Sequence, residues 1–422
     1  MDPEIPQQFE EHTDIPKRLY PALKSFHYRD FRWLWLGTFA FFMSTSMQQI
    51  TRGWLVLQLT EDSPFALSLV MMSFALPLTF ASLLGGALAD RLSRKQIMIL
   101  SQGGSLLMVI SLATLDYTGL IRFWHLIVIG FINGTMAAFN MPSRNSLISD
   151  IVPENDLMNA ISLNSSGMNL TRIIGPASAG VLILFLDTAG VFYLIACINS
   201  VSLFFTSLIN EGKTSDGGAG KGVAADILDG FKYAKEDPVL MGLVIISFVP
   251  ALFGFPYIAL LPAWSREALN ANSDGLGLLM MVMGMGSLTG TITLASIKRF
   301  KRRRLFLNAN GLIWGLALFF FSRCFTYITA LPFLFLVGFV SSVFMALNMT
   351  LMQMYSSAEM RGRIVSMSMM TFGIMPLSAV PFGALAESIG TPGSLQVAGI
   401  ILCFFMIIFY FAHPKFRDAP KR

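Results

Sequence analysis

The sequence predicts an all-α membrane protein that crosses the bilayer many times. Hydrophobic residues make up 54% of the 422 residues and charged residues only 13%, whereas soluble domains carry about a quarter charged residues. Apolar runs of about twenty residues, long enough to span a bilayer as a helix, recur along the whole chain. These runs lack the alternation typical of barrel strands, and lipid offers backbone groups no other partner, so we expect helices.

Twelve such runs predict twelve transmembrane helices in two bundles of six. The predicted spans are 33–58, 65–89, 97–116, 123–147, 158–186, 189–209, 239–262, 275–297, 305–324, 328–354, 363–388 and 394–412. A Gly- and Ser-rich stretch, GKTSDGGAGKG, and a short amphipathic helix over 226–236 lie between the sixth and seventh spans. The predicted organisation is an N-terminal arm (1–32), a first bundle (33–209), a linker (210–237), a second bundle (238–412) and a tail (413–422).

The distribution of basic residues predicts the orientation. Most of the 30 Lys and Arg lie in the N-terminal arm, the linker, the tail and every second connection, including six at 298–304. The alternate connections hold only Arg122, Arg266 and Arg323. The positive-inside rule then places both termini in the cytoplasm. No apolar segment precedes residue 33, so we expect no cleavable signal peptide and an integral protein of the cytoplasmic (inner) membrane.

The composition also excludes several kinds of site. Cys197, Cys324 and Cys403 lie in different spans, which predicts neither a disulfide framework nor a metal site. The net charge of +5 follows from topology, so we expect no nucleic-acid partner. No Ser/His/Asp or paired-carboxylate pattern converges, so we expect neither an enzyme nor a cofactor, and we expect a monomer in the bilayer.

The two sets of spans share weak internal repeats, which indicates duplication. FNM at 139–141 matches LNM at 347–349, an offset of 208 residues, and GPASAG at 175–180 matches VPFGAL at 380–385. GGALADRLSRKQ at 85–96 matches TGTITLASIKRF at 289–300, an offset of 204 residues, and the second copy has lost the Asp.

The stretch GALADRLSRK at 86–95 resembles the loop signature of the major facilitator superfamily, Gly-x-x-x-Asp-Arg-x-Gly-Arg-Arg/Lys, with Ser93 where that family usually has Gly. Segments 52–70, 141–163 and 172–180 resemble the branch that includes macrolide exporters and the enterobactin exporter. The resemblance implies an alternating-access transporter in which a charged cytoplasmic latch grips the second bundle in one state. The implied latch residues are Gly86, Asp90, Arg91, Arg94 and Lys95.

The fifth span also resembles the antiporter motif Gly-x-x-x-Gly-Pro-x-x-Gly-Gly. The matching residues are Thr171, Gly175, Pro176, Ala179 and Gly180, of which Thr171 and Ala179 replace expected glycines. Small residues of this kind allow helices to approach closely, and Pro bends a helix. Proton antiport is therefore implied by resemblance alone. No acidic residue lies near the middle of a span, and Glu387 and Asp90 are the remaining candidate proton carriers.

Polar residues form stripes on several spans, and the resemblance places the first, fourth, seventh and tenth spans around a central cavity. Stripes of this kind face protein or water because lipid penalises them, although hydrogen bonds between helices would explain single members equally well. The candidate cavity residues are Thr45, Gln48, Gln49 and Arg52 on the first span, Asn133 and Asn140 on the fourth, Asn169 and Arg172 on the fifth, and Asn348 and Met352 on the tenth. Arg144 shares the face of Asn140.

Arg172 is the least expected of these residues because apolar sequence continues for about four turns after it. Either an anionic group of a substrate or polar groups of neighbouring helices would stabilise it. We therefore expect a secondary exporter of a small amphiphilic molecule. A lipid or lysolipid flippase of the same fold, whose substrate would bring a phosphate, and a non-transporting membrane sensor are the alternatives.

Overall fold

The structure is a computed structural model that describes residues 23–89, 93–210, 231, 233–235, 237–297, 303–357 and 360–413. These residues form helices and contain no strand. The order of elements is a 3₁₀ helix, η2 (Lys24–His27), then α1 (Arg29–Leu59), α2 (Pro64–Ala89), α3 (Arg94–Tyr117), α4 (Phe123–Ile151), α5 (Glu154–Ser207), α7 (Pro238–Phe253), α8 (Pro256–Leu269), α9 (Ser273–Ser296), α10 (Arg303–Ser322), α11 (Tyr327–Tyr355) and α12 (Arg361–Ala412). Most of the predicted linker and its short helix lie outside the described residues.

The two longest helices each cover two predicted spans and are interrupted by one residue. Asp187 in α5 has φ 55° and ψ 179°, and Gly390 in α12 has φ 79° and ψ 158°. Positive φ breaks the helical path, and glycine adopts it without steric cost. One predicted span is instead divided between α7 and α8, where Gly254 and Phe255 separate the two helices. The connections between predicted spans are thus tighter than the sequence indicated.

Eight described segments are long and apolar enough to cross a membrane. They are Arg94–Tyr117, Phe123–Ile151, Glu154–Ser207, Pro238–Leu269, Ser273–Ser296, Arg303–Ser322, Tyr327–Tyr355 and Leu377–Ala412. Glu154–Ser207 has 54 residues, which is well above the roughly 20 that one span requires. The segment therefore has the length for two spans joined at Asp187.

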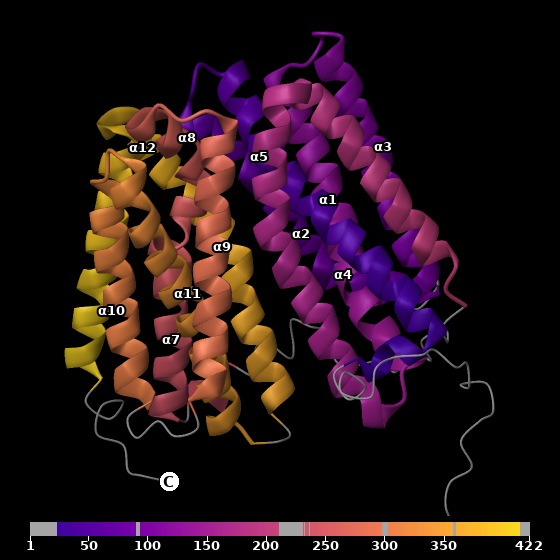
Figure 1. Cartoon of the computed structure of the whole chain (residues 1–422). Helices are drawn as coiled ribbons and strands as arrows, with labels where there is room; N and C mark the ends of the chain where they lie inside the picture. The colour runs from indigo at the N-terminus through magenta and orange to yellow at the C-terminus, as the bar shows by residue number, and fades with distance from the viewer. Residues whose placement is uncertain are drawn as a thin grey trace, which may run out of the picture.

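The helices pack as two groups, α1–α5 and α7–α12, which we call the first and second halves (Figure 1). The halves meet where α5 packs against α9 and where α2 packs against α12 and α8. We call the end where α1 leads into α2 and α8 leads into α9 the closed end. We call the opposite end, where α1, α5 and α7 begin, the linker end.

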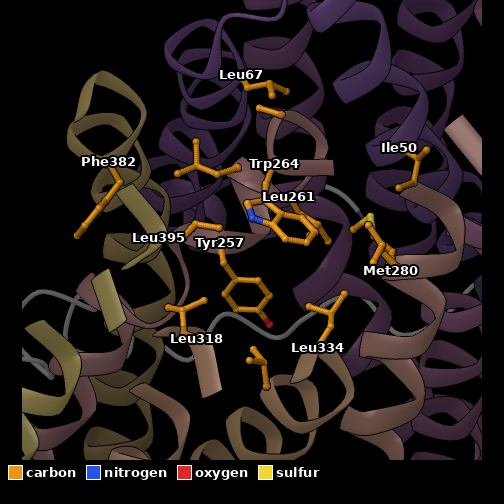
Figure 2. Packing of buried hydrophobic residues seen from close by; sticks show 14 of the residues in the cluster. Ile50, Leu67, Tyr257, Leu261, Trp264, Met280, Leu318, Leu334, Phe382 and Leu395 are labelled. Carbon is orange, nitrogen blue, oxygen red and sulfur yellow. The ribbon is translucent and has the colours of Figure 1, made fainter. Parts of the chain in front are cut away.

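The hydrophobic core is shared between the halves only in part. One large buried cluster includes Ile50 and Leu67 of the first half together with Trp264 and Met280 of the second, as Figure 2 shows. A separate cluster at the linker end belongs to the first half, with members such as Phe31 and Leu147. The described contacts between the halves therefore concentrate toward the closed end.

Candidate substrate site

The predicted stripe on α1 is graded in exposure. Thr45 is exposed, Gln49 is half-buried, and Gln48 and Arg52 are buried. Thr45 donates its hydroxyl hydrogen bond to the carbonyl of Phe41, 2.9 Å away, within its own helix. The polar face of α1 is thus accessible near its middle and becomes enclosed toward the closed end.

Asn140 of α4 lies at the centre of a buried polar cluster. It is fully buried, its Nδ2 donates to Ser101 Oγ at 2.8 Å, and its Oδ1 accepts from Arg144 Nη2 at 2.9 Å. Arg144 is 1% exposed, and its Cζ lies 4.7 Å from the ring centre of Phe41 and 5.6 Å from that of Phe42. Both polar groups of Asn140 are engaged inside the first half, so the side chain holds α3 and α4 together.

The sequence placed Arg144 on the same face as Asn140 but did not indicate the hydrogen bond between them. The spacing to Asn140 was the available signal, because residues four apart lie one above the other on a helix. The repeat in the second half has Met352 at this place. There Asn348 Nδ2 lies 3.6 Å from Met352 Sδ, and Asn348 Oδ1 is buried without a hydrogen-bond partner among the described residues.

Arg172 lies on a distinct face of α5. Gly175 packs against Ser46 of α1, and Gly180 packs against Gly277 of α9. With 3.6 residues per turn, Arg172 projects between these two contact faces. The side of α5 opposite to it carries exposed apolar residues, including Leu170. Arg172 therefore projects toward the space between the halves.

Arg172 is exposed, and no hydrogen bond or ion pair joins its side chain to the described part of the chain. Asn169, on the same side of α5, is half-buried. The described residues thus supply no acidic partner for this cation.

Polar contacts also join the halves at the closed end. Asp62 forms an ion pair with Arg266, and Ser63 donates a hydrogen bond to Glu387. The Cζ of Arg266 lies 4.4 Å from the ring centre of Trp54. Glu387, a predicted proton carrier, is exposed and accepts a hydrogen bond across the two halves. Asp62 lies in the connection between α1 and α2, and Arg266 lies in the last turn of α8, 204 residues further along the chain.

Comparison with known proteins identifies the family. The family model described as "Transmembrane secretion effector", of the major facilitator superfamily, matches residues 21–420. The chain belongs to this family. The resemblance seen in the sequence is thereby confirmed, and the protein is a multi-pass membrane transporter rather than an enzyme.

Characterised relatives extend over almost the whole transporter. The chain is 23% identical to a staphyloferrin A transporter of Staphylococcus aureus, in an alignment that covers 92% of this chain and 97% of the relative. It is 25% identical to the multidrug efflux pump Tap of Mycolicibacterium fortuitum, over 86% of this chain and 91% of the relative. It is 23% identical to macrolide efflux protein A of Streptococcus pyogenes, over 89% of this chain and 94% of the relative. Among solved structures, a POT family transporter in complex with 5-aminolevulinic acid has the same fold, with a TM-score of 0.75 at 13% identity (93% of this chain, 97% of that chain).

The predicted latch of this major facilitator protein is described in part. Asp90 and Arg91 lie outside the described residues, Gly86 belongs to α2, and Lys95 is half-buried at the start of α3. Arg94 pairs with Asp150 of α4 at 2.6 Å and also donates to the carbonyl of Ser146 at 2.9 Å. In this state Arg94 is therefore held within the first half.

Ser93, which stands where the superfamily signature has Gly, caps the start of α3. Its Oγ accepts from the backbone N–H of Gln96 at 3.3 Å, and Gln96 Oε1 accepts from the Ser93 N–H at 3.1 Å. This capping box satisfies backbone groups that the first turn of α3 would leave unpaired.

The antiporter-like motif of the transporter contacts two helices. A Cβ on Gly175 would lie 2.6 Å from Ser46 Cβ, and a Cβ on Gly180 would lie 2.4 Å from the Ser273 carbonyl oxygen. Gly175 thus permits the approach of α1, while Gly180 and Pro176 permit the approach of α9 from the other half. Thr171 and Ala179, which replace the expected glycines, are fully buried.

No group of three or more His, Cys, Asp or Glu able to hold a metal occurs in the described ranges. Cys197, Cys324 and Cys403 are free thiols.

Proposed function

We propose that this transporter exports a small amphiphilic molecule from the cytoplasm by alternating access, as a monomer in the cytoplasmic (inner) membrane. The position of Arg172 carries this proposal. A cation on the face of α5 between the halves, with no acidic partner among the described residues, is costly in a membrane helix unless water or a ligand solvates it. The efflux pumps among the relatives favour export.

The proposed topology has twelve spans with both termini in the cytoplasm. α5 and α12 each count as two spans, and α7 with α8 counts as one. The basic residues at the linker end, among them Lys24, Arg94 and Arg303, support a cytoplasmic location for that end. The closed end would then face outward, and the protein would be open toward the cytoplasm.

Transport into inside-out vesicles tests this function. Vesicles with and without the protein would receive a panel of fluorescent amphiphiles, a macrolide and a polycarboxylate siderophore, under an imposed pH gradient of either sign. A proton-coupled exporter accumulates at least one compound, and an uncoupler abolishes accumulation. Accumulation that does not respond to the pH gradient would contradict proton antiport alone, while no accumulation across the panel would contradict export.

The lysolipid flippase remains the second candidate because the phosphate of a head group would also neutralise Arg172. The same vesicles would be loaded with a fluorescent lysolipid, and its movement between leaflets would be followed by chemical quenching of the outer leaflet. Lysolipid movement without accumulation of any soluble compound would favour the flippase. Absence of both activities would favour a sensor.

A further inference from the structure

A second cation in the first half, Arg52 of α1, is enclosed rather than accessible. It is 8% exposed, and one of its Nη atoms is buried without a hydrogen-bond partner in the described part of the chain. Its Cζ lies 5.2 Å from the ring centre of Phe74 on α2. A cation–π contact of this kind compensates only part of the desolvation of a guanidinium.

Asn133 of α4 faces the same place. α1 and α4 run in opposite directions, and Arg144 of α4 lies over Phe41 of α1. Arg52 follows Phe41 by eleven residues, and Asn133 precedes Arg144 by eleven residues. Eleven residues complete about three helical turns, so both side chains return to the facing sides of the two helices at the same level.

Phe74 supports this register from a third helix. A Cβ on Gly134, the neighbour of Asn133, would lie 1.9 Å from the Phe74 carbonyl oxygen, while Arg52 lies over the Phe74 ring. Asn133 is 4% exposed, and its Oδ1 is buried without a hydrogen-bond partner among the described residues. The register therefore brings a donor of Arg52 and an acceptor of Asn133, both without a hydrogen-bond partner among the described residues, to the same level where α1, α2 and α4 meet.

Two acidic residues of the closed end are engaged with other partners in this state. Asp62 pairs with Arg266, and Glu387 accepts from Ser63. Arg144 offers an internal comparison, because the same kind of buried cation has an acceptor in Asn140 Oδ1. Gln48 precedes Arg52 by four residues, as Asn140 precedes Arg144, but no hydrogen bond joins Gln48 to Arg52 in the described part of the chain.

We propose that Arg52 and Asn133 form a buried subsite for an oxyanion of the transported molecule. Arg52 binds the carboxylate or phosphate through paired hydrogen bonds from its planar guanidinium group. Asn133 accepts a hydrogen bond from a hydroxyl or N–H next to that group, and Phe74 contacts the apolar body of the ligand. The proposal rests on the proposed function only because its ligand is the transported molecule.

The subsite is separate from Arg172. α1 and α5 run in parallel, with Gly167 against Trp35 and Gly175 against Ser46. Arg172 is therefore level with the middle of α1, about nine residues or roughly 14 Å along the axis from Arg52. A single anionic group therefore contacts one arginine at a time.

Binding of a matched pair of short probes to the purified full-length protein tests the subsite. Naphthyl-lactate carries a carboxylate, and its amide has nearly the same shape without the charge. A second pair, lysophosphatidylglycerol and a monoacylglycerol of equal chain length, distinguishes a lipid phosphate from a small-molecule carboxylate. We expect the wild type to prefer the anionic member of at least one pair by roughly tenfold or more. Equal affinities within both pairs would overturn the proposal.

Three variants locate the effect. Arg52→Gln is expected to lose the preference for the anion. Arg52→Lys keeps the positive charge but not the planar guanidinium, so it is expected to lose part of the preference. Arg122→Gln, which removes an exposed positive charge of the first half at the start of α4, is the control and is expected to keep it. Retention of the full preference in Arg52→Gln or Arg52→Lys would overturn the subsite, as would equal losses in Arg52→Gln and Arg122→Gln.

Two further controls separate folding and transport from binding. If Arg52→Gln does not yield monodisperse protein, the comparison of Arg52→Lys with wild type decides alone. Binding is measured without a gradient, so a failure of the vesicle transport assay does not affect this result. If the protein prefers the anion but transports nothing, the proposed export is refuted and the subsite is retained. If it transports a compound but shows no preference for the anion, export is retained and the subsite is refuted.

Discussion

Three arginines within predominantly apolar helices are accommodated in three different ways. Arg144 is buried against two Phe rings and donates to Asn140. Arg52 is buried over Phe74 with an unfilled donor. Arg172 is exposed between the halves. The differences between them come from the residues around each guanidinium, on the same helix and on others, so residue type and depth alone do not reveal the role of each cation.

Asn140→Leu is expected to destabilise the transporter by about 3 kcal/mol, because it leaves the buried Arg144 guanidinium without its acceptor. The matched control is Asn348→Leu at the equivalent place, where only a contact with the Met352 sulfur is lost. That change should cost about 1 kcal/mol or less. Thermal unfolding in detergent measures both, and equal shifts in melting temperature would show that the Arg144 contact contributes little.

Arg172→Ala is expected to lower transport roughly tenfold, the effect of one lost charge-assisted hydrogen bond to the substrate. The amount of folded protein in the membrane should stay unchanged, because no described residue pairs with this side chain. Transport is measured in vesicles and folded protein by size-exclusion chromatography. Loss of folded protein in proportion to activity would assign Arg172 a structural role instead.

At the scale of helices, one close approach between the halves involves glycine backbones. Gly180 of α5 and Gly277 of α9 face each other, and added Cβ atoms would collide with backbone atoms on the opposite helix. The predicted small-residue motif therefore brings together the two halves as well as two helices of one half.

Gly180→Ala is expected to lower the melting temperature, by the equivalent of about 1–3 kcal/mol for an overpacked contact. It should also weaken closure, because α5 and α9 must separate to accommodate the new methyl group. Gly103→Ala is the control, since a Cβ at Gly103 meets no atom within 4 Å and alanine favours a helix over glycine. A melting temperature for Gly180→Ala as high as that of Gly103→Ala would exclude a tight contact at this point.

Much of the helical architecture could be predicted from apolar runs, because lipid leaves a membrane chain few alternatives to the helix. The breaks at Asp187 and Gly390 fall in the gaps between predicted spans, but the apolar runs did not indicate that a single residue of positive φ makes each turn. The polar stripes were found by their periodicity, yet periodicity does not tell which member is satisfied by a neighbour, as Asn140 is. The pair Asp62 and Arg266 joins residues 204 positions apart in the chain, and no local pattern in the sequence indicates such a contact.

At the scale of the whole molecule, the two halves share a hydrophobic core and polar contacts toward one end. At the linker end the first half has a hydrophobic cluster of its own. An alternating-access cycle would have to break the contacts of the closed end and make new ones at the linker end, where the predicted latch lies.

Reversal of the charge at Asp62 or Arg266 is expected to favour opening of the closed end. The pair is partly exposed, so we expect about 1 kcal/mol or less from it, a shift of up to roughly fivefold in the population of the closed form. Distances between spin labels at Gln58 and Asn270, both exposed, would measure this in a cysteine-free background. Asp62→Arg and Arg266→Asp should each broaden the distribution toward longer distances, and the double exchange should reverse the change. Identical distributions in all four proteins would exclude a role in closure.

The stacking of Arg266 on Trp54 gives the protein an optical sensor of its own state. Trp54 is 6% exposed, on α1, and the cation above its ring comes from the other half. Opening of the closed end would remove the cation and hydrate the indole, which moves tryptophan emission to longer wavelength. Comparison of wild type with Trp54→Phe would isolate this signal from the other tryptophans among the six in the chain. The fluorescence of an unlabelled protein, recorded while candidate compounds are added, would then report which of them drive the cycle.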